Sequence, residues 1–140
     1  LNTVFMVSLY GEIMTEYSLL AILNSSLLRA YWIDRFYDQR KTFPKIKGTY
    51  LKELPVIPKE LAQAGRHRLV ELDSLAREAS RLAASAHEVR LEGGSEVIGR
   101  RRDALERQMD DEVYALFGVS PDAAGKVGAL LERFAVASGQ

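Results

Sequence analysis

Residues 69–89 read LVELDSLAREASRLAASAHEV, and the spacing of their apolar side chains decides the fold that we expect. Leucine and alanine recur at alternating steps of three and four residues, which is the spacing of the a and d positions in a coiled coil. The seam consists of Leu69, Leu72, Ala76, Ala79, Ala83 and Ala86. We therefore predict, from residue 59 onward, a helix of about 30 residues that is roughly 45 Å long.

A second helix is predicted after the break at Gly93 and Gly94. Its apolar side carries Ile98, Leu105, Met109, Val113 and Leu116. Because a short Gly-rich connection joins the two helices, we expect them to fold back as an antiparallel hairpin. A third helix is predicted with Ser120 as its N-cap and Pro121 at the first helical position, and we expect it to end near Ala137.

The N-terminal residues predict a strand followed by a helix. Apolar and polar residues mix in a strand-like pattern over residues 2–12, and Thr15 is a suitable N-cap for a helix from Glu16 toward Phe36. Steps of three and four residues indicate one apolar face on this helix, formed by Leu19, Leu20, Leu23, Leu27, Leu28, Tyr31 and Trp32. We expect this face to pack against the strand, and residues 24–26 to lie on the solvated side.

Residues 42–58 read TFPKIKGTYLKELPVIP and follow neither the period of a helix nor that of a buried strand. They predict a fixed loop or a short edge strand, because their prolines are incompatible with a central strand position. We therefore expect an α+β fold that is predominantly α. Its parts are a small α/β unit at residues 1–58, an antiparallel helical hairpin at residues 59–118 and a final helix at residues 119–140.

The composition is that of an ordinary globular domain. With 140 residues, of which 47% are hydrophobic, the chain is long enough for one modest core. The sequence has no apolar run long enough for a transmembrane helix, so we expect no membrane partner. The absence of cysteine fits a reducing cytoplasm, where we expect the protein to be located. The chain begins at Leu1, inside the strand-like pattern and without an initiator Met, and we expect it to be a fragment of a longer protein.

Positive charge is concentrated in one segment, although the formal net charge is zero. Residues 29–52 carry seven Lys or Arg against two Asp, which gives a net charge of plus five. The stripe Arg35, Arg40, Lys41, Lys45, Lys47 and Lys52 is interleaved with Phe36, Tyr37, Phe43 and Tyr50. Such a mixture suits contacts with a sugar-phosphate backbone and a base edge. Equally, the aromatic residues could belong to the core while the lysines keep an edge strand soluble, and spacing does not decide between these interpretations.

Motifs of common enzyme sites are missing from the sequence. His67 and His87 match no zinc-binding spacing, and the glycine pair at residues 93–94 lacks the Lys and hydroxyl of a phosphate loop. The acidic residues 110–112 occupy consecutive helical positions and point in different directions, so they do not converge on one metal ion. Three adjacent arginines at residues 100–102 have acids within reach, which favours ion pairs over phosphate contact.

Several short stretches resemble a known family. The residues LNS at 23–25, FPKI at 43–46 and YLKELPVIP at 50–58 are similar to a pattern of the TaqI-like C-terminal specificity domain. This is the target recognition domain of adenine-specific DNA methyltransferases, including bifunctional type II restriction and modification enzymes. The stretch MDDEVYALFG at 109–118 also resembles the ending found after the helical spacer of such enzymes.

The resemblance implies a partial target recognition domain that docks on duplex DNA, followed by a hairpin that acts as a spacer or docking element. It also implies a parent protein with an N-terminal methyltransferase domain that uses S-adenosylmethionine, and Mg²⁺ if the parent carries a nuclease. The chain itself lacks the Asn-Pro-Pro-aromatic motif of adenine methylation, so we expect no catalytic, cofactor-binding or metal-binding residue in it. The predicted DNA-binding residues are Arg35, Arg40, Lys41, Lys45, Lys47, Tyr50 and Lys52. We expect the lysines to neutralise phosphates and Arg40 or Tyr50 to approach a base edge.

A second hypothesis comes from a different functional class. In it, the chain is a helical protein-interaction or dimerisation module that docks to a methyltransferase or nuclease domain, with a homodimer formed through the hairpin. It depends on the alanine-rich seam and on the apolar residues of the last helix, Val127, Leu130, Leu131 and Phe134.

Overall fold

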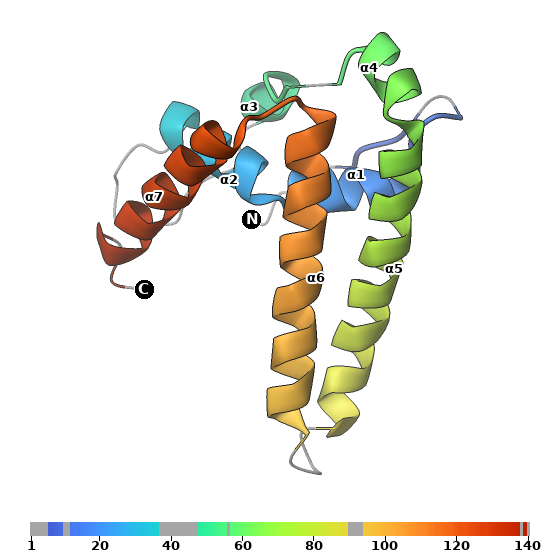
Figure 1. The fold of residues 1–140 in the computed structure, drawn as a ribbon, viewed down its shortest axis with the longest axis vertical. Helices are drawn as coiled ribbons and strands as arrows, with labels where there is room; N and C mark the ends of the chain where they lie inside the picture. The colour runs from blue at the N-terminus through green and yellow to red at the C-terminus, as the bar shows by residue number, and fades with distance from the viewer. Residues whose placement is uncertain are drawn as a thin grey trace.

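The computed structural model describes residues 6–9, 12–36, 48–55, 57–89, 94–137 and 139. Over these residues the chain forms seven helices and no strand (Figure 1). The helices are α1 (Glu16–Leu23), α2 (Ser26–Phe36), α3 (Gly48–Lys52), α4 (Lys59–Ala64), α5 (Arg66–Val89), α6 (Ser95–Leu116) and α7 (Pro121–Ala137).

Helices α5 and α6 form the antiparallel hairpin that the sequence predicts, and they lie side by side along most of their length (Figure 1). The predicted single helix from residue 59 is interrupted, however, because α4 ends at Ala64 and α5 begins at Arg66. Gly65 lies at this junction, where a Cβ atom would come within 2.5 Å of Leu116 Cδ1. Glycine therefore allows the junction to approach the end of α6 closely.

Burial along the predicted seam is uneven. Leu69, Leu72 and Ala76 are buried, but Ala79 is only half-buried and Ala83 is exposed. The buried half is the half that α1 crosses, whereas the other half of the hairpin extends beyond the remaining helices (Figure 1). Burial on the alanine side of α5 therefore follows the contact with α1.

One hydrophobic core joins the N-terminal helices to the hairpin. Its buried members are Ala21, Ile22, Leu28, Ile57, Ala62, Leu69, Leu72, Ala76, Val113 and Leu116. Helix α1 packs across α5 and also contacts α6. Figure 1 shows α2 and α7 on the side of α6 that faces away from α5. The core therefore continues across residue 58, with residues from both sides of that position in contact.

The predicted α/β unit at residues 1–58 is wrong for the part of it that the structure describes. Residues 6–9 and 12–15 form no strand, and residues 48–52, expected in a loop or edge strand, form the short helix α3. The rest of the predicted strand, residues 2–5, 10 and 11, lies outside the described residues. A strand needs partners for its backbone N–H and C=O groups. Within the described part of residues 1–58, no second strand supplies them.

The helix predicted from Glu16 to Phe36 is also divided, by the residues Asn24 and Ser25. The Asn24 side-chain amide donates to the Leu20 carbonyl at 3.1 Å, and the Ser25 hydroxyl donates to the Ile22 carbonyl at 2.7 Å. Such bonds compete with helix continuation. Ser25 is consequently buried, at 3% exposure, where the sequence predicts a solvated residue.

The break between α1 and α2 also changes which residues face the core. Leu20 and Leu23 belong to the predicted apolar face but are 45% and 40% exposed. Ser18 and Ala21 are buried in their place, at 1% and 4%. The predicted face is therefore wrong for α1, because a single helical phase does not extend across residues 24 and 25.

Helix α7 begins and ends as predicted. The Ala123 amide donates to the Ser120 hydroxyl at 3.2 Å, which makes Ser120 the N-cap. Before it, α6 ends at Leu116, and Gly118, two residues further on, has a left-handed φ of 68°. The Val119 amide reaches back to the Tyr114 carbonyl at 2.8 Å, as in a Schellman C-cap.

Candidate nucleic-acid interface

Aromatic side chains connect the end of α2 to α3. Phe36 and Tyr50 are stacked, with ring centroids 4.5 Å apart and an interplanar angle of 17°. The Trp32 ring meets both of them edge-on, at centroid distances of 5.1 Å to Phe36 and 5.8 Å to Tyr50. Contacts of these kinds are favourable beyond their buried area. This aromatic cluster of Trp32, Phe36 and Tyr50 holds the two described parts of the basic segment, residues 29–36 and 48–52, against each other.

Arg35 lies beside the aromatic cluster and is held by Tyr31. Its Nε donates to the Tyr31 hydroxyl oxygen at 3.4 Å, and its guanidinium carbon lies 5.4 Å from the centre of the Tyr31 ring. The Tyr31 hydroxyl donates in turn to the Glu53 carbonyl at 3.3 Å. The hydrogen bond to Tyr31 raises the pKa of Arg35, whose guanidinium is charged at physiological pH in any case. The result is an exposed cation with a preferred position at the end of α2.

The structure locates some of the predicted DNA-binding residues. Arg35 and Lys52 are exposed in the last turns of α2 and α3. Tyr50 is half-buried, and its ring stacks on the residue next to Arg35. The remaining predicted residues, Arg40, Lys41, Lys45 and Lys47, lie outside the described residues. Phe36 and Tyr50 are stacked and half-buried. They are therefore neither fully exposed for contact with DNA nor fully buried in the core, which were the two interpretations that the sequence left open.

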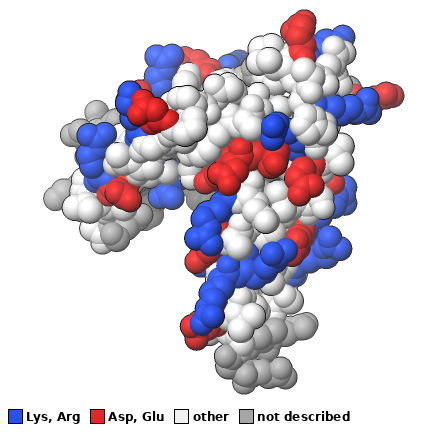
Figure 2. All heavy atoms as spheres, in the orientation of Figure 1, with Lys and Arg blue, Asp and Glu red and all other residues white. Residues whose placement is uncertain are grey.

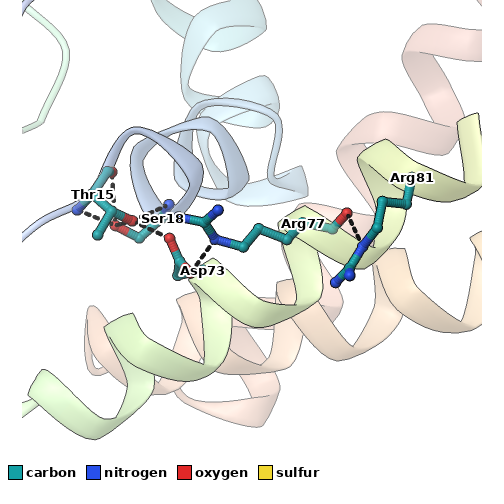
Figure 3. Close-up of polar contacts among 5 residues, drawn as sticks. All are labelled: Thr15, Ser18, Asp73, Arg77 and Arg81. Carbon is teal, nitrogen blue, oxygen red and sulfur yellow. Dashed lines mark hydrogen bonds and ion pairs between the residues drawn. The ribbon is translucent and has the colours of Figure 1, made fainter. Parts of the chain in front are cut away.

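A polar network connects the start of α1 to α5 (Figure 3). Thr15 and Ser18 form a capping box, in which the Ser18 amide donates to Thr15 Oγ1 at 3.1 Å and the Thr15 amide donates to Ser18 Oγ at 2.9 Å. The Thr15 hydroxyl also donates to Asp73 Oδ1 at 2.5 Å. Arg77 Nε donates to Asp73 Oδ2 at 2.7 Å, and the Arg77 guanidinium lies 4.3 Å from the centre of the Tyr17 ring. The hydrogen bond from Arg77 and then that from Thr15 lower the pKa of Asp73.

A second carboxylate connects the start of α2 to α6. The Ser26 amide donates to Asp110 Oδ1 at 2.8 Å, and the Ser26 hydroxyl donates to Asp110 Oδ2 at 2.5 Å. The sequence interpretation took Asp110 only as one of three acidic residues that do not share a metal ion, and it gave no signal for this contact. Ser26 and Asp110 also line a groove of about 490 Å³ between the α1–α2 junction and the hairpin.

The other charged groups of the hairpin mostly form ion pairs with one another. Arg100 pairs with Glu96, and Arg101 pairs with Glu78. Arg102 Nη2 lies 3.6 Å from Asp103 Oδ1, and Arg102 Nε lies 3.9 Å from Glu106 Oε1. Figure 2 shows the two signs of charge interleaved over the hairpin. The ion pairs predicted for residues 100–102 are therefore present, and they lower the net positive potential of this surface.

The described ranges lack a metal-binding cluster and a membrane-spanning helix. In those ranges, no three His, Cys, Asp or Glu side chains are placed so that they could hold a metal ion together. Nor does any helix there have both the length and the apolar character that crossing a bilayer requires.

The segment that contains α1, α2, α3 and all the basic residues 29–52 can be compared with known families. Residues 1–56 match the family model of the TaqI-like C-terminal specificity domain. The resemblance found in the sequence is thus confirmed over these residues. Domains of the TaqI-like family have a DNA-recognition role in restriction-modification enzymes. No curated protein and no solved structure matches the chain.

Proposed function

We propose that this chain is a non-catalytic DNA-binding fragment of a type II restriction-modification enzyme or N6-adenine DNA methyltransferase. In this proposal it docks on duplex DNA and contributes to sequence specificity. The observation that supports it is a coincidence of position, since the TaqI-like family match at residues 1–56 contains the segment of net charge plus five at residues 29–52. Clustered cations gain affinity for DNA by releasing its condensed counterions.

The described geometry is compatible with a division of labour within that segment. Arg35 and Lys52 are exposed, and Arg35 is held in place by Tyr31, so both are available to phosphates. The aromatic cluster brings the ends of the segment together, which reduces the entropy lost when its cations bind one DNA surface. We assign phosphate neutralisation to Lys41, Lys45, Lys47 and Lys52, and contact with a base edge to Arg40 or Tyr50.

We also propose a parent protein for the chain. It has an N-terminal methyltransferase domain that transfers a methyl group from S-adenosylmethionine to adenine, and it works in the cytoplasm. An Asn-Pro-Pro-aromatic motif encoded upstream of Leu1 is the expected finding. An upstream sequence without a methyltransferase motif would contradict this part of the proposal.

The test is fluorescence anisotropy of a labelled mixed-sequence duplex, titrated with the chain at several salt concentrations. For the Lys45→Ala/Lys47→Ala variant we expect weaker binding and a slope of log affinity against log salt that is smaller by about two. The matched control is Lys59→Ala/Lys126→Ala, which removes two exposed lysines outside the basic segment and should keep the slope. Salt-independent binding, or a Lys45→Ala/Lys47→Ala variant that binds like the unmodified chain, would show that the DNA surface is misassigned.

A further inference from the structure

We infer that the helical hairpin is an integral part of the DNA-recognition unit, and that its two carboxylates Asp73 and Asp110 are positioning residues for α1 and α2. This inference rests on the proposed function, because it concerns how the DNA-binding segment is oriented. The resemblance to the family implies a hairpin that serves as a spacer or docking element. The hydrogen bonds between the hairpin and α1 and α2 assign it a more direct role.

Asp110 completes the N-cap of α2. The first amides of a helix have no acceptor within the helix, and α2 meets this need from two sources. The Ser25 hydroxyl accepts from the Leu28 amide at 3.3 Å, and the Asp110 carboxylate accepts from the Ser26 amide. A negative charge at a helix N-terminus is favoured by the helix dipole. Because both Asp110 oxygens bind Ser26, the carboxylate fixes the position of this residue as well as satisfying its amide.

Asp73 acts on the cap of α1 rather than on a helix amide. It accepts from the hydroxyl of Thr15, whose oxygen also accepts from the Ser18 amide. Figure 3 shows Arg77 one turn further along α5, extended toward the same carboxylate. Since the Arg77 guanidinium lies over the Tyr17 ring, the contact includes a second residue of the N-terminal helices.

Two anchors on different helices of the hairpin constrain orientation more strongly than one. Asp73 on α5 holds the first residue before α1, and Asp110 on α6 holds the first residue of α2. Helix α2 has 11 residues and is thus about 16 Å long, so a tilt of about 10° at Ser26 would move its far end by roughly 3 Å. That far end carries Arg35 and leads into the aromatic cluster. A binding site functions only if its residues are displaced by much less than this distance.

The contact between Ser26 and Asp110 joins two stretches of sequence that each resemble the family. Asp110 belongs to the MDDEVYALFG stretch, and Ser26 directly follows the LNS stretch. The structure brings them into direct hydrogen-bond contact although they are 84 residues apart. We infer that the role of the carboxylate in the later stretch is to set the position of the earlier one.

The test measures the orientation of α2 and DNA binding separately, on the full chain. Trp32 on α2 is the only tryptophan and the chain has no cysteine. An acceptor dye on an Ala84→Cys substitution, at an exposed position of α5, therefore reports the distance from α2 to the hairpin by energy transfer from Trp32. In this background we compare Asp110→Ala and Asp110→Asn with Asp122→Ala, which removes an exposed carboxylate from the first turn of α7.

For Asp110→Ala we expect a broadened distance distribution and amide exchange at residues 26–28 that is about five- to thirty-fold faster, as for loss of a helix cap. Duplex affinity should fall by about three-fold while the salt slope is unchanged, because no phosphate contact is lost. Asp110→Asn keeps an acceptor for the Ser26 amide and should restore most of each property. Asp122→Ala should change neither the distance nor the affinity.

Three results would overturn the inference. An Asp110→Ala chain with an unaltered distance distribution would show that the carboxylate does not orient α2. Equal effects of Asp110→Ala and Asp110→Asn would show that hydrogen bonding to Ser26 is not the cause. A changed distance with unchanged duplex affinity would show that the hairpin is no part of the recognition unit. If the unmodified chain fails to bind DNA at all, the proposed function is wrong, and the distance measurement still tests the anchor.

Discussion

Helices α5 and α6 and helices α1 and α2 depend on different interactions. The hairpin helices have 24 and 22 residues and bury leucines and valine against each other, in addition to several i, i+4 ion pairs. Helices α1 and α2 have 8 and 11 residues, which is too short for stability in isolation. They depend on tertiary contacts, namely the shared core and the carboxylates of the hairpin. Helices α1 and α2 therefore depend on contacts with the hairpin for their stability.

The largest expected effect is the loss of stability when a buried leucine of the hairpin is replaced by alanine. It distinguishes the stability of the hairpin itself from the dependence of α1 on the hairpin. Leu72 and Leu105 are both fully buried, but only Leu72 belongs to the core cluster that includes α1. Leu72→Ala and Leu105→Ala should each lower the free energy of unfolding by about 2–5 kcal/mol, measured by denaturant titration. In hydrogen exchange, Leu72→Ala should increase the exchange of α1 amides more than Leu105→Ala does. Equal exchange in α1 for the two variants would contradict the idea that α1 is built on the Leu72 side of the hairpin.

A smaller effect is expected at the end of the hairpin. Gly118 has a left-handed φ of 68°, and a Cβ atom there would meet nothing within 4 Å. Gly118→Ala should therefore destabilise the chain by about 1–2 kcal/mol through backbone strain alone. The control Gly125→Ala lies within α7 with equally open surroundings, and it should stabilise by about 0.5–1 kcal/mol. The melting temperatures of the two variants should therefore shift in opposite directions. Shifts of the same sign would argue against a C-cap of α6 that requires a left-handed residue at position 118.

The smallest effect concerns the pH dependence of the Asp73 anchor. Hydrogen bonds from Arg77 and Thr15 lower the pKa of Asp73 below its ordinary value of 3.8. A depressed carboxyl pKa contributes stability that is complete above the unfolded value and is lost as the pH falls through the folded value. Asp73→Asn should therefore lose up to about 1 kcal/mol near neutral pH and differ less from the unmodified chain in acid. Urea midpoints measured across this range test it, and a difference that is constant with pH would exclude ionised Asp73 as the anchor.

Sequence reasoning succeeded where a regular period extends over many residues. The three- and four-residue steps through Leu69, Leu72, Leu105 and Val113 predicted the paired helices because burial on one face imposes that period. The Ser120 cap was predicted because its signal is contained in adjacent residues. Local composition likewise located the basic segment, and the family match at residues 1–56 bears out the resemblance.

Sequence reasoning failed where the structure depends on distant partners. The predicted apolar face of α1 was wrong because Asn24 and Ser25 interrupt the helix. No spacing rule gives the change in helical phase at such an interruption. The Ser26–Asp110 contact was missed because hydrogen bonding between residues 84 positions apart leaves no periodic signal. Arg35 was predicted as a DNA-binding residue from local composition, whereas its attachment to Tyr31 and the stacking of Phe36 on Tyr50 became visible only in three dimensions.

The core that continues across residue 58 has a consequence for recombination between related genes. A crossover at that residue would give each product Ile22 and Leu28 from one parent and Leu72, Val113 and Leu116 from the other. Each new hybrid would then combine surfaces that had not been selected to fit each other, and mismatched cores cost stability. The residues up to Leu116 should therefore be exchanged as one block, and chimaeras joined beyond α6 should fold more reliably than those joined before α4.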